Sequence, residues 1–121
     1  MATKKELSKS DKIKNEKKKL EKIFKPILDE KKMKLAQSLI DKVSFMSVTL
    51  DSLQEEITEK GCTEVYYNGK EQHGIKKSTA VDIYNTMIKN YNTVMKQLLD
   101  LLPKEVKVED IDEFDEFVNK K

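Results

Sequence analysis

Apolar residues between positions 33 and 60 recur with the spacing of one helix face. Their steps alternate between three and four residues over three heptads, at Ala36, Leu39, Val43, Met46, Leu50, Leu53 and Ile57. This alternation keeps an apolar stripe on one side of an α-helix. Gly61 follows the stripe, and glycine is common just past the end of a helix. We therefore predict a long helix that ends at Lys60.

A second stripe with the same spacing lies nearer the C-terminus. It consists of Val81, Tyr84, Ile88, Tyr91, Met95, Leu98 and Leu102, with Met87, Val94 and Leu101 as an added column. Thr79 and Asp82 fit a capping box, Ser78 is an alternative cap, and Pro103 stops the helix. Such a stripe is wider than one partner helix can cover.

The segment between the stripes, residues 61–77, interrupts the helical pattern. Asn68-Gly69 is a strong turn dipeptide, and residues 64–67 have strand-like side chains. A short β-hairpin and an irregular loop both fit. The predicted fold is therefore all-α: an antiparallel hairpin of two long helices over residues 26–102, joined by a loop or a short β-hairpin.

Two charged segments flank this core. Residues 1–25 form a Lys-rich arm with high helix propensity and few apolar residues, which we expect to be helical or partly disordered and to end at Pro26. Residues 103–121 form an acidic tail with four lysines against seven acids. Its apolar residues fall near one helical face, at Ile111, Phe114, Phe117 and Val118. Such a segment docks on a partner or on its own subunit, and both alternatives stay open.

The positive charge of the chain is concentrated near its N-terminus. The first 34 residues hold 13 lysines against six acids, and the chain has no arginine. Lysine attracts phosphate, whereas arginine is the usual reader of guanine, so the pattern favours contact with the DNA backbone. The candidate DNA-binding residues are Lys12, Lys14, Lys17, Lys18, Lys19, Lys22, Lys25, Lys76 and Lys77. Glu16 and Glu21 also fit a solvated, salt-bridged helix, and that alternative stays open.

Little in the sequence points to catalysis. Cys62 is the only cysteine, His73 the only histidine, and the three glycines form no phosphate-binding pattern. We expect no enzyme activity, no metal and no cofactor. No apolar run is long enough to span a membrane and the N-terminus has no secretory pattern, which predicts a soluble protein inside the cell with no membrane partner.

The two predicted helices carry more apolar residues than a two-helix hairpin can bury. We therefore predict self-association into a larger bundle or ring. In a monomeric two-helix hairpin, Leu35, Ile40, Phe45 and Val48 would remain exposed, as would the added column of the second stripe. Tyr84 and Tyr91 belong to the packing seam in preference to a base-stacking surface. The candidate interface residues are Val81, Tyr84, Ile88, Tyr91, Met95, Phe45 and Val48.

Residues 30–105 resemble the small subunit of tailed-phage terminases. The most telling part is "NG" followed by "GIKKSTAVDIYNTMIKNY". The resemblance implies a non-catalytic homo-oligomer, often a ring, that binds double-stranded phage DNA in the cytoplasm of the infected bacterium. It also implies that the acidic tail, with Ile111, Phe114, Phe117 and Val118, engages the large terminase subunit and regulates its ATPase and nuclease.

The Lys-rich arm departs from the family, because it shows no helix-turn-helix pattern of the kind many small subunits carry. DNA contact would then run through lysine and phosphate. The alternative function is a cytosolic helical scaffold or chaperone-like protein that binds only proteins.

Overall fold

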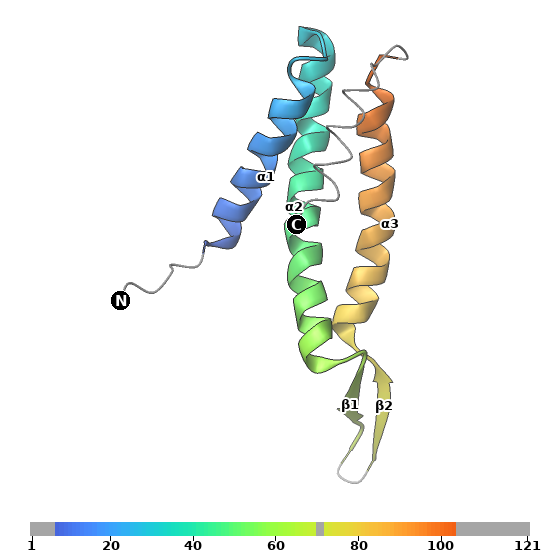
Figure 1. The fold of residues 1–121 in the computed structure, drawn as a ribbon. Coiled ribbons are helices and arrows are strands. Elements are labelled where there is room, and N and C mark those ends of the chain that lie inside the picture. Colours follow the sequence, from blue (N-terminus) through green and yellow to red (C-terminus); the bar gives the residue numbers. More distant parts are fainter. Residues whose placement is uncertain (1–6, 70–71, 104–121) are drawn as a thin grey trace, which may run out of the picture.

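The chain folds into three helices and a two-stranded hairpin (Figure 1). The computed structural model describes residues 7–69 and 72–103. The elements in chain order are α1 (Lys9–Phe24), α2 (Glu30–Lys60), β1 (Thr63–Tyr67), β2 (His73–Lys77) and α3 (Thr79–Asp100). Both predicted long helices are confirmed. Of the two alternatives for residues 61–77, the structure has the β-hairpin.

Local signals explain the helix boundaries. The Ser8 hydroxyl accepts a hydrogen bond from the Asp11 amide at 3.1 Å and begins α1, which ends directly before Lys25-Pro26. Asp29 begins α2 in the same way, with 2.8 Å from its carboxylate to the Lys32 amide. Gly61 ends α2 with a φ of 84°, a conformation that costs little only for glycine.

The predicted capping box at the start of α3 is wrong, and the alternative cap is the one observed. Ser78 is the N-cap, and its hydroxyl accepts a hydrogen bond from the Val81 amide at 3.1 Å. Thr79 is the first residue of the helix. Its hydroxyl donates to Glu64 at 2.8 Å, so it is engaged outside the helix and does not cap it.

The core is built by all three helices. α1 and α3 both pack against α2, each antiparallel to it (Figure 1). The buried cluster consists of Leu20, Phe24, Leu28, Ala36, Ile40, Val43 and Leu98. Leu20 and Phe24 come from the segment that the sequence set apart as an arm, so the core extends beyond residues 26–102.

Two exposure predictions are also wrong. Ile40 is fully buried and Val48 is 5% exposed, although both were expected to be exposed in a monomer. That expectation considered only two helices. α1 also packs on α2, and its Leu20 and Phe24 share one buried cluster with Ile40.

α1 covers only part of α2. At 1.5 Å per residue, the 16 residues of α1 extend about 24 Å and the 31 residues of α2 about 46 Å. We call α1 with residues 30–46 and 91–100 the three-helix half, and residues 47–60 with 79–90 and the hairpin the two-helix half. The buried cluster described above contains no residue of the two-helix half.

Candidate nucleic-acid interface and assembly surface

The α1 lysines divide into paired and unpaired side chains. Lys17 Nζ lies 3.6 Å from Asp41 Oδ1, and Lys19 Nζ lies 3.6 Å from Glu16 Oε1. Five candidate lysines are exposed and make no ion pair with any acid of the described residues: Lys12, Lys14, Lys18, Lys22 and Lys25.

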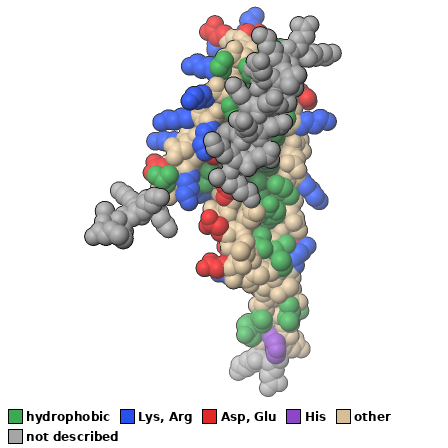
Figure 2. Space-filling view, viewed as in Figure 1, with side chains coloured by type: hydrophobic (Ala, Val, Ile, Leu, Met, Phe, Trp, Pro, Cys, Tyr) green, Lys and Arg blue, Asp and Glu red, His purple; other side chains and the backbone are tan. Residues whose placement is uncertain are grey.

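The packing of α1 explains why these lysines face solvent. Leu20 and Phe24 point into the core, so side chains two residues away, at positions 18 and 22, lie on the opposite side of the helix. Residues 9–25 hold eight lysines against three acids. Figure 2 shows lysine side chains projecting from α1 along its length. The result is a positively charged helix surface held in a fixed orientation.

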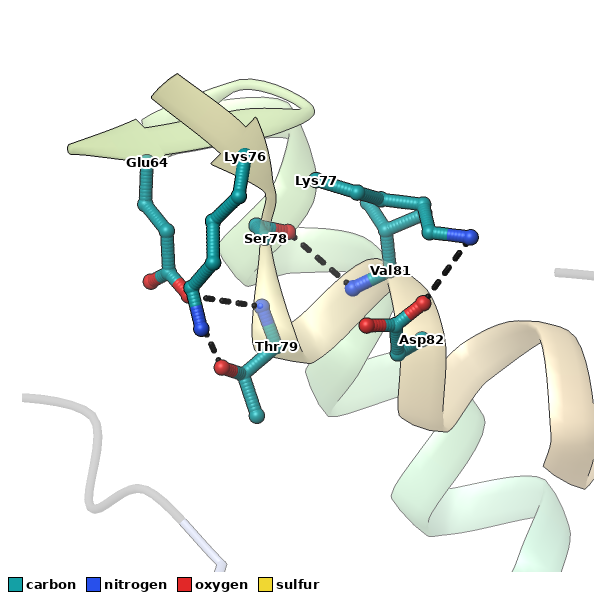
Figure 3. Close-up of polar contacts among 7 residues, drawn as sticks. All are labelled: Glu64, Lys76, Lys77, Ser78, Thr79, Val81 and Asp82. Carbon is teal, nitrogen blue, oxygen red and sulfur yellow. Dashed lines mark hydrogen bonds and ion pairs between the residues drawn. The ribbon is translucent and has the colours of Figure 1, made fainter. Parts of the chain in front are cut away.

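Lys76 and Lys77 do not join this surface. They lie at the end of β2, next to the start of α3 and at the other end of the molecule from the C-terminus of α1 (Figure 1). Lys76 Nζ is 3.4 Å from Glu64 Oε1, and Lys77 Nζ is 3.0 Å from Asp82 Oδ1 (Figure 3). Their charges are compensated within the chain, so they are weaker candidates for phosphate contact.

Glu64 joins the hairpin to α3 (Figure 3). Its Oε1 accepts hydrogen bonds from the Thr79 hydroxyl at 2.8 Å and from the Thr79 amide at 3.1 Å. These two bonds, with the nearby Lys76, hold the pKa of the Glu64 carboxyl below its ordinary value. This contact is not predictable from the sequence, because nothing in the local pattern links Glu64 to Thr79, 15 positions away.

The hairpin leaves one apolar face uncovered. β1 and β2 pair antiparallel with Val65 opposite Ile75 and Tyr67 opposite His73, so these four side chains share a face. Val65 is 53% exposed, Tyr67 79% and Ile75 73%. On the other face, the Tyr66 ring occupies the space where a Cβ at Gly74 would stand, 2.8 Å from the ring.

The candidate interface residues occupy different environments. Phe45 is 47% exposed, with Lys9 Nζ 4.8 Å from its ring centroid, and Val48 is buried. The α3 members are half-buried: Val81, Tyr84, Ile88, Tyr91 and Met95. A shallow depression of about 530 Å³ lies between α2 and α3, lined by Ser38, Asp41, Lys42, Phe45, Met46 and Val94.

Cys62 and His73 do not form a thiol–imidazole pair. Cys62 precedes β1 and His73 begins β2 at the far end of the hairpin, so five residue pairs, or about 16 Å, separate them. No group of three or more metal-ligating side chains occurs in residues 7–69 and 72–103. Within those same ranges no helix is long and apolar enough to cross a membrane.

The candidate large-subunit contact lies outside the described residues: Ile111, Phe114, Phe117 and Val118. Comparison with known proteins adds no identification. No family model, no curated protein and no solved structure matches the chain.

Proposed function

We propose that this chain is a non-catalytic, self-assembling adaptor that holds duplex DNA on the lysines of α1, in the role of a terminase small subunit. The observation that carries the proposal is the set of exposed, unpaired lysines on a helix whose orientation is fixed by buried Leu20 and Phe24. The resemblance of residues 30–105 to small terminase subunits supplies the biological setting. In that setting the protein works in the cytoplasm of an infected bacterium and recruits the large subunit through its acidic tail.

The chemistry of α1 favours sequence-independent contact with phosphate. Duplex DNA carries one negative charge per about 1.7 Å of its axis, so a helix of about 24 Å faces many phosphates. Lysine binds them as a point charge, and no arginine is present to read guanine bidentately. Five lysine contacts would give a slope of about −4.5 for log binding constant against log salt.

The two-helix half supports self-assembly. Large apolar side chains of α3 and of the hairpin remain exposed there, including Ile83 at 44%, Val65 at 53% and Ile75 at 73%. Exposed apolar surface of this kind favours a protein interface. An assembly would also place several α1 helices on one DNA, and multivalent attachment raises the overall affinity well above that of one helix.

DNA binding is tested by removing equal charge from two places. Lys18→Gln/Lys22→Gln should lower the magnitude of the salt slope by about 2, because two phosphate contacts are lost. The matched control, Lys76→Gln/Lys77→Gln, should leave the slope unchanged. Filter binding of a duplex across a salt series measures both. Equal losses in the two variants would show that only net charge matters, and a flat salt response of the unmodified protein would remove DNA from the function.

A helical scaffold that binds only protein is the second candidate. The exposed face of Val65, Tyr67 and Ile75 favours it, because such a face suits a protein partner better than a phosphate backbone. This function predicts an assembly that forms normally and shows no salt-dependent DNA affinity.

A further inference from the structure

The described chain ends close to the lysine-rich helix. Pro103 follows α3 at the end of the molecule where α1 ends and α2 begins (Figure 1). Residues 104–121 follow it and lie outside the described part. Eighteen residues span about 27 Å even at the short rise of a helix, so this segment is long enough to reach along the whole of α1.

α1 and α3 present a common face that combines apolar and basic side chains. Tyr91, Met95 and Ile23 are half-buried and pack against the same core cluster. Burial raises the pKa of the Tyr91 phenol, and the negative charges of Glu16 on α1 and Asp51 on α2 add to the rise.

Two lysines lie on the α1 side of this face. Lys19 precedes Ile23 by four residues, so it lies on the same side of α1 as that half-buried side chain, and it pairs with Glu16. Lys12 precedes Glu16 by four residues, which places it on the same side of the helix. A ligand on this face would therefore meet apolar surface next to positive charge.

The tail has the complementary chemistry. Residues 109–116 contain six acids and no lysine, and Ile111, Phe114 and Val118 recur at helical spacing through and just beyond them. The described residues of the two-helix half hold six acids against four lysines, whereas the three-helix half holds twelve lysines against six acids. Charge therefore directs the tail to the three-helix half.

We propose that residues 104–121 dock on their own subunit, on the face formed by Lys12 and Lys19 of α1 and by Tyr91 and Met95 of α3. There the acids occupy Lys12, one of the five unpaired lysines, and place negative charge beside the others, so a partner that captures the tail also frees the DNA-binding helix. The competition rests on the proposed function, whereas the docking does not.

The docking is tested without DNA in the full-length chain. The protein has no tryptophan, so Phe117→Trp introduces a single fluorescent reporter in the tail. Its emission should be blue-shifted, and the shift should be lost when Met95→Glu or Lys12→Glu/Lys19→Glu is added. Lys12 and Lys19 are exposed, so the second variant keeps the fold even if Met95→Glu does not. Ile83→Glu, on the two-helix half of the same helix, is the matched control and should retain the shift.

Three results would overturn the docking. These are solvent-exposed emission in Phe117→Trp alone, equal loss of the blue shift in the Met95 and Ile83 variants, or loss of the blue shift on hundredfold dilution, which would indicate contact between subunits.

A separate experiment tests the competition with DNA. Phe114→Ser/Phe117→Ser keeps every charge and should bind duplex DNA about tenfold more tightly, because a tethered competitor acts at millimolar effective concentration. Equal affinity would overturn the competition; a docked reporter with no DNA binding by either chain would overturn the proposed function and leave the docking in place.

Discussion

The two halves of the molecule combine charge and burial in opposite ways. The three-helix half contains the most charged helix, α1, yet Leu20 and Phe24 within it are the largest fully buried side chains. The two-helix half contains the hairpin, whose Val65, Tyr67 and Ile75 are all more than half exposed. The charged helix α1 is thus packed into the core, while the hairpin, with its exposed apolar face, projects from it (Figure 2).

The contrast shows that burial depends on neighbours more than on composition. α1 needs only a narrow apolar stripe, because α2 already offers the complementary surface of Ala36 and Ile40. The hairpin has apolar residues and no described element to cover them. A two-stranded sheet is marginally stable alone, so this half depends on its attachment to α3 and on whatever covers its open face.

The largest effect is expected from Phe24→Ala. Phe24 is fully buried, and truncating such a phenylalanine typically costs about 3–5 kcal/mol of the free energy of unfolding. Circular dichroism during urea unfolding measures the loss. Lys18→Ala on the exposed side of the same helix should stay within about 0.5 kcal/mol. A loss below about 1 kcal/mol for Phe24→Ala would mean that α1 is not part of the cooperative core.

The sequence predicted the two long helices well, because their signals are local and redundant. The three-four spacing of α2 and α3 fixes their type, and Pro26, Gly61 and Pro103 limit where helices can run. The sequence did not decide which residue is the N-cap of α3. Ser78 and Thr79 both carry a hydroxyl, and the contact that decides between them is with Glu64, 15 residues away from Thr79.

The packing of α1 and the form of the hairpin were also harder to predict, because both depend on residues that are distant in the sequence. α1 has four apolar residues, Ile13, Leu20, Ile23 and Phe24, which are too few to predict from the sequence that the helix packs against the core.

In the hairpin, Asn68-Gly69 correctly suggested a turn. The strands, however, are joined by five residues, closed by a 2.7 Å bond from the Asn68 amide to the Gln72 carbonyl, and a longer connection of this kind resembles a loop in sequence.

An intermediate effect is expected at the assembly surface of the two-helix half. Ile88 is half-buried on α3, in the half where the described residues provide no third helix. Ile88→Glu should change the free energy of unfolding of the isolated chain little. A charge placed in an apolar interface should, however, lower the association constant of the assembly tenfold or more, which corresponds to about 1.4 kcal/mol. Light scattering across a concentration series measures the change in mass.

The control for this assembly test is Thr86→Glu, an exposed position on the same half of α3. It adds the same charge two residues away, on another side of the helix, and should leave the assembly mass unchanged. If Ile88→Glu assembles like the unmodified protein, or if the unmodified protein is monomeric at micromolar concentration, the two-helix half does not form the interface.

The smallest effect concerns the attachment of the hairpin to α3. The pKa of Glu64 is lowered in the fold, by the Thr79 hydroxyl first, so the folded carboxyl holds its proton less tightly than the unfolded one. Its contribution is therefore complete above the ordinary carboxyl pKa of about 4.3 and is lost as the pH falls through the lowered folded value. The side chain is open to solvent, so hydrogen exchange of the Thr79 amide should report this loss before global unfolding does. Glu64→Gln should abolish the dependence, and Glu59→Gln on α2 should preserve it. An unchanged acid response in Glu64→Gln would show that a titrating group other than Glu64 controls the opening at Thr79.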